Sequence, residues 1–149
     1  MILSDHEILT EVADKEGIKP YLPELLNPSA YEVRLGRYLT TEHGEKIDLC
    51  HVDTYTLNPG EFLIAQTIET FKLPTLITAQ FKIRETLVKQ GLLGESTVTE
   101  EALHSGGYLT FALKNYSQHT PIVLDHGMKV GKLTFMWLGD TPDNSLEVR

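Results

Sequence analysis

Cysteine, clustered positive charge and long apolar runs are all scarce in this sequence. Cys50 is the only cysteine among the 149 residues, so one chain can form no internal disulfide and we expect a reducing, cytoplasmic compartment. The 13 Lys and Arg residues are outnumbered by 21 Asp and Glu residues, and the formal net charge of −8 disfavours nonspecific binding to nucleic acid. No segment is apolar over the length of a membrane span, so we expect no membrane association.

The chain has the length and the apolar content of one globular domain. Its apolar fraction of 41% over 149 residues is sufficient for a hydrophobic core without a disulfide or a metal. We therefore predict a single domain over residues 1–149, in which 139–149 form a polar tail. The histidines lack a metal-ligand spacing such as H-x-x-x-H, so the sequence predicts no metal site.

A helix signal stands at the N-terminus. Ser4 and Glu7 have the spacing of a capping box, in which each residue's side chain accepts a hydrogen bond from the other's backbone N–H. Ile8 and Val12 follow at helical spacing. We predict a short helix of about ten residues that ends at Gly17, since glycine favours the position after a helix.

From Tyr31 onward the apolar residues alternate with polar ones. Tyr31, Val33 and Leu35 fall on one face of an extended chain, and Glu32 and Arg34 fall on the other. Similar segments, separated by turn signals rich in Gly and Pro, are Thr54–Leu57, Glu61–Ile68, Gln80–Ile83, Tyr108–Leu113, Pro121–Leu124 and Lys129–Trp137.

One helical interruption is predicted between these strands, at Arg84–Gln90, where Gly91 ends it. The whole pattern predicts a mainly β fold, either a sandwich, a distorted jelly roll or a barrel. The predicted fold contains a short N-terminal helix and one short internal helix.

Five segments, taken in order, resemble the dCTP deaminase/dUTPase family. Residues 1–5 (M-I-L-S-D) are similar to its start, and residues 28–36 (P-S-A-Y-E-V-R-L-G) to its P-S-S-Y-D-L-R-L-G. Residues 57–62 (L-N-P-G-E-F) resemble its L-x-P-G-E-F turn, residues 84–92 (R-E-T-L-V-K-Q-G-L) its triphosphate-binding R-S-S-L-A-R-L-G-L, and residues 127–135 (G-M-K-V-G-K-L-T-F) its late hairpin. The resemblance implies a dUTPase-type β-barrel-like fold, a homotrimer and nucleotide sites at subunit boundaries.

The resemblance also implies a chemistry whose general base is missing here. Members of this family deaminate dCTP, hydrolyse dUTP to dUMP, or do both, without the zinc of other deaminases. Their base is a Glu on a strand that reads T-L-E-L, and Thr110, Phe111 and Ala112 align with its first three residues. We take all three as candidate nucleotide-binding residues. The methyl group of Ala112 accepts no proton, and general-base catalysis is worth roughly 10²–10⁴-fold.

A second carboxylate position of the family also differs. The same register places Ala102, another candidate nucleotide-binding residue, on the Asp that orients the attacking water in dUTP hydrolysis. Glu100 or Glu101 can substitute if the loop shifts by a residue or two, so both are candidate catalytic residues. The other interpretation is that both are solvated loop carboxylates.

The triphosphate-binding stretch keeps some of the family's residues. Arg84, Thr86 and Lys89 match it and are candidate nucleotide-binding residues, while Glu85 replaces the first Ser. A Glu near a helix N-terminus is stabilised by the helix dipole. In the alternative interpretation it occupies the anion site, where two unit charges about 4 Å apart repel by roughly 4 kcal/mol at an effective dielectric near 20. Mg²⁺ is expected only with a bound nucleoside triphosphate, and zinc is not expected.

Three other side chains each have competing interpretations. Cys50 is more typical of a buried or half-buried small hydrophobe than of a nucleophile. Arg34 is an interface or phosphate residue, or else a solvated charge on a strand. His104 lies in the predicted cleft segment, but a turn or surface histidine is more common.

Three functions are compatible with these residues. The first is an enzyme that acts on dCTP or dUTP, with a carboxylate such as Glu85, Glu100 or Glu101 in the missing role. The second is a catalytically inactive relative that binds a deoxynucleotide (dCTP, dUTP or dTTP) or a protein partner and has a regulatory role. The third is a purely structural trimer. The tail 139–149 contains no Tyr, Lys or Gln, the residues of the family's lid, so we expect any closure over a nucleotide to differ.

Overall fold

A computed structural model describes residues 1–96 and 100–141, and for residues 100 and 101 it describes the backbone alone. The strands are β1 (Ile18–Lys19), β2 (Leu26–Asn27), β3 (Ala30–Thr41), β4 (Lys46–Asp48), β5 (Thr54–Leu57), β6 (Phe62–Phe71), β7 (Ile77–Ile83), β8 (Leu92–Ser96), β9 (Gly107–Asn115), β10 (Ile122–Asp125) and β11 (Lys129–Trp137). The helices are short: α1 (Asp5–Glu11), α2 (Leu49–Val52), α3 (Glu85–Lys89) and α4 (Glu100–His104), with 3-10 turns η1 (Ala13–Lys15) and η2 (Pro23–Leu25).

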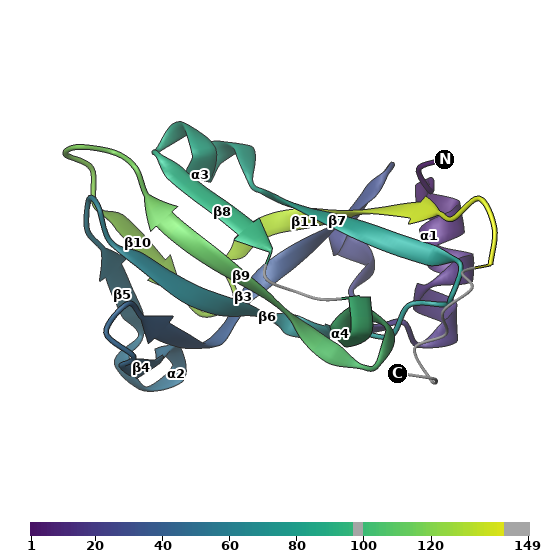
Figure 1. Cartoon of the computed structure of the whole chain (residues 1–149), viewed down its shortest axis with the longest axis horizontal. Coiled ribbons are helices and arrows are strands. Elements are labelled where there is room, and N and C mark those ends of the chain that lie inside the picture. Colours follow the sequence, from purple (N-terminus) through teal and green to yellow (C-terminus); the bar gives the residue numbers. More distant parts are fainter. Residues whose placement is uncertain (97–99, 142–149) are drawn as a thin grey trace.

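One large antiparallel sheet forms most of the molecule. Its strands run in the order β7-β11-β3-β6-β9-β8, while β1 pairs with β6, and β2 and β4 pair with β3. β5 and β10 form a separate pair at the end of the molecule opposite α1 (Figure 1). The two ends of the strand path, β7 and β8, approach each other, so the sheet is nearly closed and barrel-like. The predicted mainly β, barrel-like fold is confirmed.

Gly94 of β8 shows how close β7 and β8 come. A Cβ atom at this position would lie 2.6 Å from Cδ1 of Ile83, the last residue of β7. A larger residue there would have to displace the side chains of Ile83 and Leu113, so Gly94 favours the close approach of β7 and β8. Because successive residues of a strand face opposite sides, the adjacent Glu95 points outward, and it is exposed.

The predicted alternation in β3 is confirmed. Tyr31, Val33 and Leu35 are fully buried, and Glu32 and Arg34 are half-buried on the opposite face. β5 and β11 have the predicted bounds, and β6, β7, β9 and β10 differ from the predicted ones by at most three residues at either end. β8 was not predicted, because its sequence around Gly94 has little β propensity and its pairing with β9 is a tertiary effect.

The N-terminal helix starts as predicted and ends differently. The capping box of Ser4 and Glu7 is confirmed, with both reciprocal hydrogen bonds formed. α1 is followed by the turn η1, and Glu16 rather than Gly17 has the left-handed conformation, with φ of 59°. Gly17 is required for another reason: its N–H donates to the carbonyl of Val12 at 2.8 Å, and a Cβ would lie against that oxygen.

The fold contains more internal helices than the single one that the sequence predicts, namely α2, α3 and α4. Asp48 is the N-cap of α2, and its side chain accepts a hydrogen bond from the Cys50 N–H at 3.0 Å. This turn buries Leu49 and leaves Cys50 exposed, so the prediction of a buried or half-buried cysteine is wrong. In the part of the chain that the structure describes, no helix has the length and apolar character needed to cross a membrane.

Candidate functional site

The segment that resembles the triphosphate-binding stretch lies where β7, α3 and β11 meet. Arg84 is the N-cap of α3, and its backbone N–H donates to the carbonyl of Val130 on β11 at 3.0 Å, which ties this turn to the sheet. Arg84, Glu85 and Thr86 line one pocket of about 210 Å³; its other lining residues are Asn27, Glu32, Gly131 and Lys132. We call it the α3 pocket. Three predicted nucleotide-binding residues are therefore close together in space.

Lys89 forms an ion pair at the exposed side of α3. Its Nζ lies 3.2 Å from Oε1 of Glu85, and the two side chains are 74% and 81% exposed. A solvated pair four residues apart on a helix is worth only about 0.3–0.5 kcal/mol. Lys89 is not among the residues that line the α3 pocket, but this weak pair leaves both side chains free to rearrange around an anion.

The outer face of β9 carries the position of the missing base. Thr110, Ala112 and Lys114 are half-buried on this face, as the predicted alternation requires, because the residues between them are buried. Ala112 and Lys114 line a second pocket of about 270 Å³, whose other lining residues are Leu93, Gly94, Glu95 and Tyr116. We call it the β9 pocket. It contains a carboxylate, Glu95, although none stands at position 112.

The side chain of Phe111 lies in the core. It is fully buried, and its ring stacks on Phe81 with the centroids 4.9 Å apart. Any contact of Phe111 with a nucleotide on the outer face is therefore limited to its backbone, and its predicted binding role stays a prediction.

α4 holds the second family carboxylate position. Ala102 is half-buried there, beside Gly107 at the start of β9. Glu100 and Glu101 are the first two residues of α4, and their side chains lie outside the described residues, so their candidate catalytic role stays a prediction. His104 is held by the fold, with Nε2 3.0 Å from the carbonyl oxygen of Ile77.

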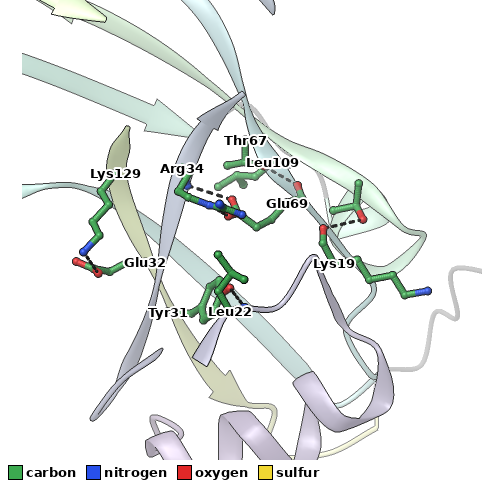
Figure 2. Close-up of polar contacts among 10 residues, drawn as sticks. Lys19, Leu22, Tyr31, Glu32, Arg34, Thr67, Glu69, Leu109 and Lys129 are labelled. Carbon is green, nitrogen blue, oxygen red and sulfur yellow. Dashed lines mark hydrogen bonds and ion pairs between the residues drawn. The ribbon is translucent and has the colours of Figure 1, made fainter. Parts of the chain in front are cut away.

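A buried ion pair joins β3 to β6 (Figure 2). Arg34 donates to Glu69 twice, from Nε to Oε2 at 2.7 Å and from its backbone N–H to Oε1 at 3.0 Å. Glu69 is fully buried in an irregular stretch of β6, where the hydroxyl of Thr67 donates to the Glu69 carbonyl and accepts the Leu109 N–H. The interpretation of Arg34 as a solvated charge is wrong, because β6 places an acidic residue against it.

Lys132 and Glu95 are among the charged residues of these pockets to which sequence reasoning gave no role. Lys132 had a signal in the sequence, because it belongs to residues 127–135, which resemble the family's late hairpin. Glu95 had none, because its strand was not predicted and its place beside Ala112 depends on the register of β8 with β9.

Solved structures of known proteins share this fold. One is the 2′-deoxycytidine 5′-triphosphate deaminase of Agrobacterium tumefaciens, with a TM-score of 0.75 and 17% identity over 90% of this chain and 47% of that one. Another is a mutant dUTPase from phage phi11 of S. aureus, with a TM-score of 0.57 and 14% identity over 87% of this chain and 89% of that one. The protein therefore has a dUTPase-type fold, and the chain spans about half the length of the Agrobacterium structure.

Sequence relatives narrow this class to one family. The family model described as dCTP deaminase-like matches residues 2–138. A dUMP-forming dCTP deaminase of Corynebacterium glutamicum (strain R) is 32% identical over 167 residues, 97% of this chain and 87% of the relative. The one of Corynebacterium kroppenstedtii is 33% identical over 165 residues, 97% of this chain and 88% of the relative. The chain belongs to the dCTP deaminase-like family of nucleotide metabolism.

Proposed function

We propose that the protein binds a pyrimidine deoxynucleoside triphosphate and that its chemistry on this ligand is altered. The observation that carries the proposal is the α3 pocket, whose lining brings together Arg84, Lys132 and the hydroxyl of Thr86. Two carboxylates, Glu32 and Glu85, line the same pocket. Charged and hydroxyl donors of this kind suit phosphate oxygens. The curated relatives above are dUMP-forming dCTP deaminases, so dCTP and dUTP are the first candidate ligands.

The proposed site forms between the subunits of a homotrimer. Within one chain the α3 pocket and the β9 pocket have no lining residue in common. A site that uses both, as the family resemblance implies, is completed when the α3 pocket of one subunit meets the β9 face of another. Mg²⁺ enters this proposal only as the counterion of the triphosphate.

The chemistry is altered because position 112 offers no carboxylate. Ala112 lies on the outer face of β9 and lines the β9 pocket. Its methyl group cannot accept a proton from water, and general-base catalysis is worth roughly 10²–10⁴-fold. Conversion of dCTP to dUTP, or of dUTP to dUMP, at this site therefore depends on a carboxylate elsewhere.

A second candidate function is a catalytically inactive relative that binds a nucleotide or a protein partner in a regulatory role. Two substitutions favour it: Ala112 removes the family's base, and Glu85 adds a negative charge to the lining of the α3 pocket. Turnover separates this candidate from the first.

The test incubates the purified protein with dCTP and with dUTP, each with Mg²⁺, and follows ammonia and pyrophosphate release. Thermal unfolding is recorded with and without each nucleotide, because a ligand at 100 times its dissociation constant stabilises by about 2.7 kcal/mol. Stabilisation with product formation supports an altered enzyme, and stabilisation without product supports the inactive nucleotide-binding relative. Absence of stabilisation and of product with both nucleotides contradicts nucleotide binding altogether.

A further inference from the structure

Glu95 of β8 lies directly opposite Ala112 of β9. In the antiparallel register Glu95 pairs with Ala112, and Leu93 pairs with Lys114. Directly opposed residues of an antiparallel pair project to the same face, with Cβ atoms about 4.5–5.5 Å apart. A carboxylate is therefore present on the outer face of the sheet, one strand away from the position where the family carries it.

The same residues line one pocket. Glu95, Ala112 and Lys114 all contribute to the β9 pocket of about 270 Å³. The Glu95 carboxylate has no ion-pair or hydrogen-bond partner in residues 1–96 and 100–141, so no protein group competes with a water or ligand for it. Lys114, which lines the same pocket, forms no ion pair with this carboxylate, and its Nζ lies over the ring of Tyr116, 5.3 Å from the centroid.

The fold also fixes the direction in which Glu95 points. Gly94 faces Ile83 of β7 and Leu113 of β9 on the inner side of the sheet. A Cβ at this position would lie within 3 Å of both side chains. β8 cannot rotate to turn position 95 inward without forcing position 94 outward. The carboxylate is thus held on the side of the sheet that Ala112 occupies.

We propose that Glu95 is the general base of this protein, in place of the strand Glu that Ala112 lacks. The inference rests on the proposed binding of dCTP. The Glu95 carboxylate takes a proton from water as the water oxygen bonds to C4 of cytosine. The C4=N3 electron pair moves to N3 as this bond forms. The carboxylate then delivers its proton to the amino nitrogen, and the C4=N3 bond re-forms as the bond from C4 to the amino group breaks. Transfer of the remaining hydroxyl proton to N3 completes the uracil ring, so that dCTP and water give dUTP and ammonia.

The test compares Glu95→Gln with the unchanged protein and with Glu42→Gln, a control that removes an exposed carboxylate from the turn between β3 and β4. Ammonia release from dCTP gives kcat, and isothermal titration with dCTP gives the affinity. We expect Glu95→Gln to lower kcat by about 100-fold or more, with dCTP affinity and thermal stability close to those of Glu42→Gln.

A rescue variant tests the position rather than the residue. In Glu95→Gln combined with Ala112→Glu, the carboxylate moves back across the strand pair without two opposed charges. We expect the kcat of this double variant to be at least about tenfold higher than that of Glu95→Gln alone, within the range of general-base catalysis.

The remaining outcomes contradict the inference in distinguishable ways. Full activity in Glu95→Gln, or loss only in Glu100→Gln or Glu101→Gln, overturns the role of Glu95. Binding of dCTP without turnover in the unchanged protein also overturns it, and leaves the proposed nucleotide binding intact. Absence of dCTP binding in the unchanged protein shows instead that the proposed function itself fails.

Discussion

Two ion pairs of this molecule have similar geometry, but one is buried and the other is exposed to solvent. Arg34 and Glu69 are 2.7 Å apart with side chains 19% and 0% exposed, whereas Lys89 and Glu85 are 3.2 Å apart and largely solvated. A buried charge that loses its partner is costly, but a solvated pair contributes almost nothing. The comparison separates charges that hold the barrel together from charges that remain available to a ligand.

This difference also restricts where a nucleotide can bind. The Arg34 guanidinium already donates to Glu69 inside the sheet, so it is a structural group. Arg84, Glu85 and Thr86 line an open pocket. In the proposed function phosphate therefore binds in the α3 pocket and not at Arg34. The following predictions test this division of the charges, from the largest expected effect to the smallest.

Glu69→Ala should have the largest effect. It leaves the Arg34 guanidinium without its carboxylate, and one of its nitrogens, Nη2, already lacks a hydrogen-bond partner among the described residues. Removal of one partner from a buried pair costs about 3–5 kcal/mol. Chemical denaturation should show this loss, and thermal unfolding should shift down by roughly 10 °C.

The matched control for this variant is Glu85→Ala, which also removes one partner of an ion pair. Its free energy of unfolding should change by less than about 0.5 kcal/mol. The double variant Arg34→Met/Glu69→Leu should regain most of the loss, because it leaves no buried charge unpaired. Equal losses in Glu69→Ala and Glu85→Ala would show that burial does not distinguish the two pairs.

Arg84→Ala should reduce nucleotide affinity without reducing stability. A hydrogen bond to a charged group contributes about 1.5–3 kcal/mol, which is about 10- to 100-fold in the dissociation constant. Isothermal titration with dCTP and with dUTP measures it, and Lys46→Ala, which removes a cation beside Tyr38, is the control. Unchanged affinity in Arg84→Ala means that phosphate is bound elsewhere.

Glu85→Ser should tighten triphosphate binding. The solvated position of Glu85 weakens its repulsion of a phosphate to about 1 kcal/mol at 4 Å, well below the value for a partly buried site. The expected gain is about fivefold in affinity. A gain of several hundredfold would indicate that Glu85 blocks the anion site directly, and a loss would indicate that it supports the ligand.

The sequence predicts the fold better than it predicts the site. Alternation in β3, β9 and β11 is local, so strands with one buried face can be recognised from the chain alone. β8 could not, because Gly94 lacks a side chain for a tertiary reason, its close approach to Ile83. Because this strand was not predicted, the position of Glu95 beside Ala112 was not predicted either.

The same limit applies to charges. The sequence brings Arg84, Glu85 and Thr86 together because they are adjacent, and the structure places them in one pocket. The partner of Arg34 is 35 residues away along the chain, at an inward position of an alternating strand. A Glu at such a position is itself a signal, since charged residues are almost never fully buried unless they are paired.

The smallest effect is expected at a third pair, in which Arg37 and Asp48 are 2.9 Å apart with side chains 52% and 28% exposed. The hydrogen bond from Arg37 lowers the pKa of Asp48 below its ordinary value of 3.8. Because the folded-state pKa is the lower one, the stabilisation is fully present above the unfolded pKa and disappears as the pH falls through the folded pKa.

An NMR titration of the Asp48 carboxyl group should therefore give a midpoint below 3.8, and Arg37→Gln should raise it toward that value. The stability difference between the unchanged protein and Arg37→Gln should be small at pH 7 and should vanish as the pH falls below the Asp48 midpoint. Since solvent screens this pair, the difference at pH 7 should lie far below the loss in Glu69→Ala. A comparable loss would mean that exposure does not rank the ion pairs of this barrel, and the distinction between structural and ligand-available charges would then not hold.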